Sequence, residues 1–322
     1  MRRFCVFMVL VALAVSSVHA IDKEKNLIFL CIGQSNMEGN ATPESQDKTG
    51  VSTHFKKMYV ANSDGDNIYH WATAVPPLAR KNTGLTPVDY FGRYLVDSLA
   101  KDYYVRVIVV AIAGCSIKIF LPDKCEDYIK GEADWMQNIA AEYDNNPYER
   151  LITAAKEAQK YGNIRGVLLH QGETDAYNDE WLANVKKVYV NIIRDLELNV
   201  NDVPLLAGEV VNADQNGQCA GANNTINKLP NTLKTAYVIS SKGCPAGADN
   251  LHFSVEGYRE LGKRYGAKMF QILKEKGVAT RSGVESPKAS HSDIIYDLSG
   301  RKLDAPTIGL QIIGGKMVYY AE

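Results

Sequence analysis

The chain has 322 residues, with 36 basic and 37 acidic side chains and a formal net charge of −1. This balance argues against nucleic acid or an anionic membrane surface as a partner and favours a neutral one. The length is enough for one large domain with a sizeable core and a small appendage.

The first 20 residues have the pattern of a secretory signal peptide. Arg2 and Arg3 are basic, residues 4–15 are apolar, and small residues stand at the positions that a signal peptidase reads. The apolar core is shorter than the roughly 18 residues that a membrane span needs, and no later segment supplies one. We therefore expect cleavage after Ala20 and a mature protein that is secreted, periplasmic or held at the cell surface without a membrane span.

Apolar runs of strand length alternate with amphipathic stretches of helical length from residue 26 to about residue 277. We expect strands at 26–33, 104–113, 164–170, 204–210 and 236–240, and helices at 88–101, 147–161, 179–198, 223–233 and 255–276. Strands rich in Val, Ile and Leu between helices are typical of a parallel sheet covered on both faces. The expected fold is therefore α/β, a three-layer α/β/α sandwich with a mostly parallel five-stranded sheet.

A serine stands where the first expected strand ends. Gly33-Gln34-Ser35-Asn36 follows an apolar run directly, so the turn can expose the Ser35 hydroxyl and aim backbone N–H groups at a developing oxyanion. Ser35 is therefore a candidate nucleophile, and a helix cap is the alternative role.

A nucleophilic serine needs a base, and among the histidines of the main domain His252 has the best context. Asp249 lies three residues before it, in a turn that precedes the last helix. The carboxylate can fold back to accept the Nδ1 proton and leave Nε2 free as the base. Asp249 and His252 thus form a candidate pair of orienting acid and base.

Two further strand ends carry polar groups or an open backbone. Gln171 and Glu173 follow the strand 164–170, where Gln171 can offer an amide to an oxyanion and Glu173 brings a carboxylate to the same rim. Gly114 follows the strand 104–113 and offers an unobstructed N–H, although a glycine there is most often part of a turn.

The stretch 40–86 is rich in Asn, Asp, Gly and Pro and is too long for a simple connection. We expect it to build the rim of the substrate cleft.

Five cysteines remain beyond the leader, an odd number that leaves at least one thiol unpaired. Cys115 and Cys125 flank one loop-rich region and Cys219 and Cys244 another, so an oxidising compartment would permit two disulfides, but neither pairing follows from spacing. Cys31 lies in the first strand and is interpreted as a small buried hydrophobic residue. No metal-binding spacing of Cys or His occurs, and no metal is expected.

Taken together, the four strand-end blocks resemble the SGNH hydrolase superfamily, in the branch of sialate O-acetylesterases and family six acetylxylan esterases. Gly33-Gln34-Ser35-Asn36 and the Gln171-Gly172-Glu173 run match that branch, and the resemblance covers roughly residues 26–277. It implies a flavodoxin-like SGNH domain over 21–277.

The resemblance also implies the roles of the site residues. The triad would be Ser35, His252 and Asp249, and the oxyanion hole would use the Ser35 and Gly114 N–H groups with the Gln171 side chain. Glu173 is the alternative acid, or a contact to substrate or to the Ser35 turn. We favour Asp249 because its short separation from His252 sets the geometry locally.

The implied activity is that of a serine esterase that removes O-acetyl groups from carbohydrates, such as acetylated xylan or sialic acid-type glycans, through an acetyl-enzyme and without a cofactor. The alternatives are an esterase or lipase for longer acyl esters and a non-catalytic surface glycan-binding protein. Tyr69 and Trp71, in the expected rim, are candidates to stack on sugar rings.

The composition changes after residue 277. Residues 278–290 are expected to form a short polar linker, and 291–322 a strand-and-turn tail too small to bury a core alone. Residues 296–301 and 309–316 resemble the carboxyl-terminal sorting tail of type IX secretion cargo. That resemblance implies secretion machinery as a partner, and the alternative is a β appendage docked on the main domain.

Overall fold

The computed structural model describes residues 21–278, residue 280 and the strand segments 295–296, 302–303, 309–313 and 316–320. The expected signal peptide, 1–20, lies outside the described residues, and so does most of the expected linker, 278–290. Among the residues that are described, no helix has the length and apolar character needed to cross a membrane.

The main domain is built on a seven-stranded sheet in the order β3-β2-β4-β1-β5-β6-β7. The strands are β1 (Asn26–Gly33), β2 (Phe55–Met58), β3 (Trp71–Thr73), β4 (Tyr104–Ala111), β5 (Asn163–His170), β6 (Leu205–Gly208) and β7 (Ala236–Ile239). All neighbouring pairs are parallel except β2 and β3, which run antiparallel. The expected α/β class with a mostly parallel sheet is confirmed.

The expected number of five strands is wrong, because β2 and β3 lie within the stretch that we interpreted as an irregular rim. β2 has only four residues, two of them lysines, and β3 has three. Neither segment offers an apolar run long enough to be recognised as a strand.

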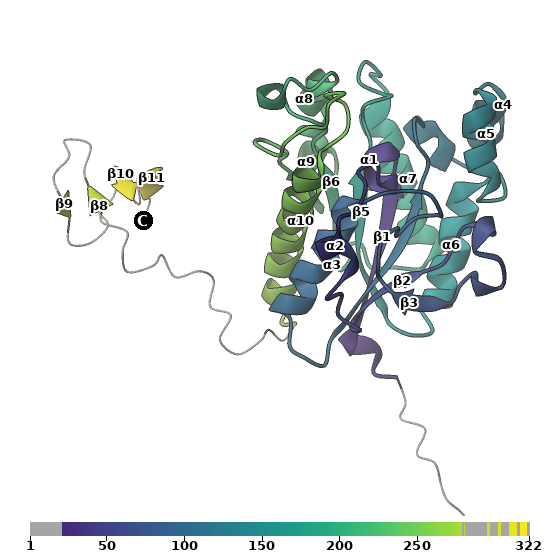
Figure 1. Ribbon diagram of the computed structural model, residues 1–322, viewed down its shortest axis with the longest axis horizontal. Coiled ribbons are helices and arrows are strands. Elements are labelled where there is room, and N and C mark those ends of the chain that lie inside the picture. The colour runs from purple at the N-terminus through teal and green to yellow at the C-terminus, as the bar shows by residue number, and fades with distance from the viewer. Residues whose placement is uncertain are drawn as a thin grey trace, which may run out of the picture.

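Helices cover both faces of the sheet, as Figure 1 shows. They are α1 (Ser35–Glu38), α2 (Ser45–Lys48), α3 (Pro87–Ser98), α4 (Cys125–Lys130), α5 (Asp134–Ala141), α6 (Pro147–Ala158), α7 (Trp181–Asp195), α8 (Asn223–Ile226), α9 (Leu229–Thr232) and α10 (Val255–Glu275). The expected helix at 223–233 is in fact two short helices, since Pro230 restricts the chain to beginning a new helix there.

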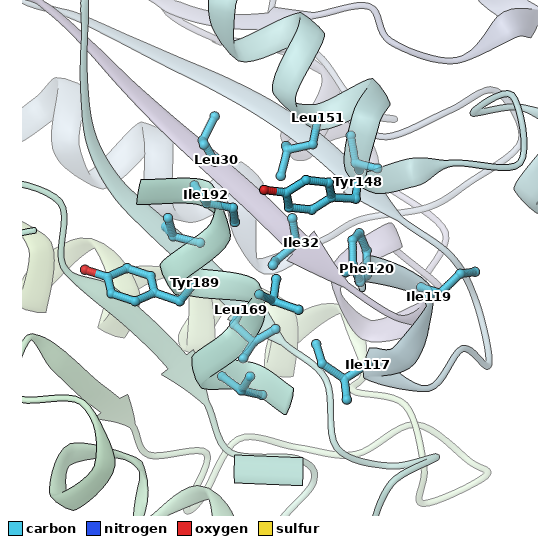
Figure 2. Close-up of a cluster of buried hydrophobic side chains, with 14 of the residues drawn as sticks. Leu30, Ile32, Ile117, Ile119, Phe120, Tyr148, Leu151, Leu169, Tyr189 and Ile192 are labelled. Carbon is cyan, nitrogen blue, oxygen red and sulfur yellow. The ribbon is translucent and has the colours of Figure 1, made fainter. Parts of the chain in front are cut away.

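The alternation of β1 shows the layers directly, because its residues divide between two apolar clusters. Leu27, Phe29 and Cys31 pack with residues of α3 and α10. Ile28, Leu30 and Ile32 pack on the other face with residues of α6 and α7, and Figure 2 shows part of this cluster around Leu30 and Ile32. The three-layer sandwich is therefore confirmed.

The major helices begin at capping residues visible in the sequence. Thr86 caps α3 and Asn146 caps α6, each followed by proline, and Ser254 caps α10 through the N–H of Gly257. Because α10 starts at Val255, the loop just before it presents its residues at the same end of the sheet as the end of β1 (Figure 1).

The described parts of the tail form four short strands, β8 (Ile295–Tyr296), β9 (Lys302–Leu303), β10 (Gly309–Ile313) and β11 (Lys316–Tyr320). They make an antiparallel sheet in the order β11-β10-β8-β9. The tail thus has the β character expected of it, and its role in sorting stays a prediction.

The two disulfides that spacing would permit do not form. The five cysteines in the described residues are all free, and Cys115 and Cys125 instead lie with their thiols near the carbonyl oxygens of Gly33 and Asn145. Cys31 and Cys244 are buried in the apolar cluster on the α3 and α10 face.

Candidate active site

The serine turn follows the end of β1 immediately. A Cβ at Gly33 would lie 2.0 Å from the carbonyl oxygen of His170 on the neighbouring strand β5, so glycine lets the two strands stay close where the chain leaves the sheet. Ser35 is the first residue of α1, and it lines a surface cleft. The sequence therefore places a hydroxyl at the carboxyl edge of the sheet, where α/β sites form.

Three side chains far apart in the sequence meet at this edge. The Nε2 atom of His252 lies 2.8 Å from Ser35 Oγ, and its Nδ1 atom lies 2.6 Å from Asp249 Oδ2. A carboxylate can only accept, so Nδ1 carries the proton and Nε2 accepts from the serine hydroxyl. The structure brings the three predicted triad residues into contact in the order that base catalysis requires.

Asp249 is held in its ionised form. Desolvation opposes its charge, but hydrogen bonds from the His252 ring and from the backbone N–H groups of His252 and Leu251 outweigh that cost and lower the pKa to about 2. The Leu251 and His252 N–H groups lie 3.0 Å and 2.9 Å from Asp249 Oδ1. The carboxylate is therefore charged at any pH at which an imidazole can act as a base.

Glu173 is not placed as the acid of this triad. Its side chain is buried, its Oε1 atom accepts from Asn36 Nδ2 at 2.6 Å, and the same oxygen lies 3.6 Å from His170 Nε2. Burial opposes its charge, but the nearby His170 ring and the hydrogen bond from Asn36 prevail and lower its pKa. Of the roles left open for Glu173, binding the Ser35 turn matches its bond to Asn36, and a contact to substrate stays a prediction because Glu173 also lines the cleft.

Two residues that line the cleft have backbone N–H groups available as donors. Ser35 and Gly114 both line it, and neither N–H donates to a backbone acceptor among the described residues. Gly114 has φ +71°, a conformation that favours glycine, and a Cβ there would lie 2.6 Å from the ring of Trp135, which would have to shift. They are the two N–H groups predicted for the backbone part of an oxyanion hole, and that role stays a prediction.

The prediction that Gln171 supplies the third oxyanion donor is wrong. The side chain is buried, and its Nε2 atom lies 2.6 Å from Asp175 Oδ2 and 3.2 Å from the Cys115 carbonyl oxygen. Its Oε1 atom accepts from the indole N–H of Trp181. The sequence showed an amide at a strand end, but not that Asp175 and Trp181 would turn it into the protein.

Gln34 is a residue of the site that we did not single out in the sequence. Its Oε1 atom accepts from Gln171 Nε2 at 3.2 Å, from the Thr174 N–H at 3.3 Å and from the Gly172 N–H at 3.5 Å. Gln34 thereby ties the serine turn to the loop after β5. Its position directly before Ser35 was the available signal.

The cleft around Ser35 has two parts. One, which we call the aromatic lobe, has a volume of about 440 Å³ and is lined by Trp135, Thr174, Cys219 and His252, among others. The other, the polar lobe, has a volume of about 350 Å³ and is lined by Glu38, Arg80, Asn82 and Thr83, among others. Ser35 belongs to both lobes, so its hydroxyl stands where they join.

The stretch 40–86 contributes to the rim as expected, since residues 40, 42–43, 80 and 82–84 line the polar lobe. Arg80 Nε donates to Glu38 Oε1 at 2.8 Å, which balances the one cation and one carboxylate of that lobe. Burial raises the pKa of Glu38, and Arg80 opposes the rise.

Tyr69 and Trp71, the predicted sugar-stacking residues, line neither lobe of the cleft. They pack against the apolar core, and the Trp71 ring lies edge-on to Tyr161 with Arg106 over its face. The aromatic side chain of the cleft is Trp135, which is 51% exposed. We missed it because residues 115–146 showed no helical period that we recognised, whereas the structure forms α4 and α5 there.

In the part of the chain that the structure describes, no group of three or more His, Cys, Asp or Glu residues is arranged to hold a metal ion.

Two comparisons with known proteins agree, because both match this chain to carbohydrate esterases. Residues 25–271 match the family model described as carbohydrate esterase, sialic acid-specific acetylesterase. A probable carbohydrate esterase from Arabidopsis thaliana is 28% identical over 252 residues, which are 74% of this chain and 87% of that protein.

Solved structures share the fold. An X-ray structure of an Arabidopsis thaliana protein superposes with a TM-score of 0.57 at 20% identity, covering 77% of this chain and 98% of that one. The crystal structure of NanS gives a TM-score of 0.53 at 16% identity, covering 79% of this chain and 99% of that one. At these identities the likeness is one of fold.

Proposed function

The chain belongs to the carbohydrate esterase family of sialic acid-specific acetylesterases, and from that premise we propose that Ser35 is the nucleophile with which it removes O-acetyl groups from carbohydrates. The protein is thus a carboxylic ester hydrolase that acts on carbohydrates. The observation that carries the assignment of the site is the hydrogen-bonded series Ser35, His252, Asp249 at an open cleft.

The first half of the reaction uses the contacts already in place. Ser35 Oγ attacks the acetyl carbonyl carbon while His252 Nε2, 2.8 Å away, takes the hydroxyl proton. The imidazolium that forms is stabilised by Asp249, whose low pKa keeps it charged and acceptor-only. The negative charge that develops on the carbonyl oxygen is stabilised by the N–H groups of Ser35 and Gly114.

The second half returns the enzyme to its starting state. His252 gives its proton to the sugar oxygen as the ester bond breaks, which releases the alcohol and leaves the acetyl group on Ser35. A water molecule, deprotonated by the same Nε2, then attacks the acetyl-enzyme, and His252 returns that proton to Ser35 Oγ as acetate leaves. Each proton passes through one imidazole, so neutral His252 is the form that starts both the attack by Ser35 and the attack by water.

The aromatic lobe supports a sugar as the alcohol part of the substrate. Trp135 is half exposed and close to Gly114, so its ring offers an apolar face beside the oxyanion donors. Sugar rings present C–H faces that pack on such aromatic surfaces. We assign Trp135 as the platform for the acetylated sugar, in acetylated xylan or a sialic acid-type glycan.

The test is acetate release from a panel of acetylated glycans, with p-nitrophenyl acetate as a small reference substrate. We expect the wild-type protein to cleave both and the Ser35→Ala variant to cleave neither. Turnover of p-nitrophenyl acetate by Ser35→Ala would overturn the nucleophile. Equal rates on acetyl and butyryl esters would favour a longer-chain esterase, and glycan binding without acetate release would favour a binding protein.

We also propose that the protein is exported. The support is the leader pattern of residues 1–20 and the likeness of the tail, 291–322, to sorting signals of type IX secretion cargo. The mass of the mature protein from a host with that secretion system tests both parts: the first residue should be Ile21, and removal of residues 291–322 should abolish release to the surface or medium.

A further inference from the structure

We propose that Asn36 is a positioning residue that holds the base His252 against the nucleophile Ser35. The inference rests on the proposed function, since it assigns a role in the same reaction. Asn36 directly follows the nucleophile in the sequence and is fully buried. Its side chain is therefore beside the reacting hydroxyl without itself reaching the cleft.

The Asn36 amide bonds the backbone on both sides of the base. Its Nδ2 atom donates to the carbonyl oxygen of Leu251 at 3.1 Å, and its Oδ1 atom accepts from the N–H of Phe253 at 3.3 Å. His252 lies between these two residues. A single side chain of the serine turn thus holds the peptide segment that carries the imidazole.

The orientation of the amide is fixed by its other two contacts. Nδ2 also donates to Glu173 Oε1 at 2.6 Å, and Oδ1 also accepts from the Tyr258 hydroxyl at 2.7 Å. An amide has two donor hydrogens and two acceptor positions, and all four are used here. A rotation of the amide by 180° would place Oδ1 against the carboxylate of Glu173 and the Leu251 carbonyl, which can only accept.

This contact is the main connection between the two halves of the site. Among the described residues, the hydrogen bonds between residues 33–39 and the loop 246–254 are made by Ser35 and Asn36 alone. No sheet ladder joins the two segments, and Ser35 and His252 lie 217 residues apart in the sequence. The Ser35 to His252 distance therefore depends on Asn36 rather than on the sheet.

The experiment compares Asn36→Ala with Asn26→Ala. Asn26 is also a buried asparagine and lies at the opposite end of β1, where its side chain donates to the Asp22 carbonyl at 2.9 Å and accepts from Arg106 at 2.8 Å. Both variants lose buried hydrogen bonds and should unfold at a lower temperature than the wild type. Only the first lies at the base.

For p-nitrophenyl acetate we expect kcat of Asn36→Ala to fall about 10²-fold with KM within about threefold, because a displaced base affects the chemical step more than binding. In Asn26→Ala kcat should stay within about twofold of the wild type. If the two variants have the same kcat at matched loss of melting temperature, Asn36 is merely structural and the proposal fails.

Labelling of Ser35 by a serine-directed phosphonate separates this proposal from the proposed function, because it needs the Ser35 to His252 contact but no acetyl ester or sugar. In Asn36→Ala the labelling rate should fall by about the same factor as kcat. If the wild-type protein is labelled but releases no acetate, the proposed function is wrong. The labelling rates of the wild type and Asn36→Ala would still decide the role of Asn36.

Asn36→Asp is the second variant, should alanine prevent folding. It keeps the size of the side chain and its acceptor for Phe253 but has no donor for the Leu251 carbonyl, and it places a second carboxylate against Glu173. We expect a loss of kcat of at least about tenfold. Wild-type kcat and labelling in this variant would overturn the proposal.

Discussion

Two histidines of this protein each have a carboxylate three residues away in the sequence, and the two pairs behave differently. His252 Nδ1 lies 2.6 Å from Asp249 Oδ2, with the His252 side chain 19% exposed. His170 Nε2 lies 3.6 Å from Glu173 Oε1, with the His170 side chain fully buried.

The second ring nitrogen separates the two pairs. In His252 it faces the hydroxyl of Ser35, whereas both ring nitrogens of His170 are buried without a hydrogen-bond partner among the described residues. A histidine near a carboxylate is thus a base only when its other nitrogen faces the cleft. The same contrast, between groups at the cleft and groups that bond inward, separates the two carboxylates Asp249 and Glu173. It also separates Gly114 from Gln171 and Trp135 from Trp71.

The largest effect should come from removing the cleft-facing imidazole. We expect His252→Ala to lower kcat for p-nitrophenyl acetate by about 10⁴-fold or more, because the serine then has no base. His54, which stacks on Tyr104 away from the cleft, is the matched control, and His54→Ala should keep kcat. A similar loss of kcat in both variants would contradict the assignment of His252 as the base.

The two carboxylates can be compared next. Asp249→Asn should lower kcat by about 10³-fold, because an amide can no longer stabilise the imidazolium or fix its tautomer. Glu173→Gln should lose less than about tenfold, since a glutamine oxygen can still accept from Asn36. Steady-state kinetics of the two variants decides which carboxylate is the acid, and the reverse order would restore Glu173 to that role.

Gly114, which we assign as an oxyanion donor, and Gln171, which bonds inward instead, form a third pair. Gly114→Ala should lower kcat by about 10²-fold, because a Cβ at φ +71° and 2.6 Å from Trp135 must displace the N–H from the cleft. Gln171→Ala should mainly lower the melting temperature and affect kcat less, since the Gln171 amide forms its hydrogen bonds inside the protein. A Gln171→Ala variant of wild-type stability but with kcat lowered as far as in Gly114→Ala would contradict the inward placement.

Two tryptophans differ in the same way, because Trp135 lines the cleft whereas Trp71 packs against the core. Trp135→Ala should raise KM for an acetylated glycan about tenfold, the size expected for one lost stacking contact. Tyr177 is 95% exposed and does not line either lobe, so Tyr177→Ala serves as the exposed aromatic control and should keep the wild-type KM. Equal KM values for the two variants would remove Trp135 as the sugar platform.

The smallest effect concerns stability against acid. The folded pKa of Asp249 is lowered from 3.8 to about 2, so its contribution to stability is present above pH 3.8 and is lost as the pH falls toward 2. Thermal melting of the wild type and Asp249→Asn should therefore differ near neutral pH and converge on acidification through that range. A difference that stays constant down to pH 2 would mean that the native state does not favour ionised Asp249.

Much of this fold could be predicted because its strands are buried on both faces. β1, for example, is a continuous apolar run with the bounds that we expected, and Pro87, Pro147 and Ser254 mark helix starts. Short elements such as β2 and β3 could not be predicted, because their few residues are held by neighbours rather than by an apolar pattern of their own.

The site divides in the same way. The contact between Asp249 and His252 is local in sequence, and its geometry could be argued from a turn. The inward rotation of Gln171 depends on Asp175 and Trp181, and the exposure of Trp135 depends on where α5 packs. Such properties are set by tertiary contacts, which one sequence pattern does not contain.

Gly33 has a consequence for how β1 finds its alignment. All eight residues of the strand are buried, and both of its faces are apolar, so hydrophobicity alone would tolerate a slide of the strand by two residues. Only position 33 of this strand lacks a Cβ, and only there does the His170 carbonyl come close enough to forbid one. The glycine therefore fixes the pairing register of β1 against β5, and with it the position along the sheet edge at which the next residues leave the strand.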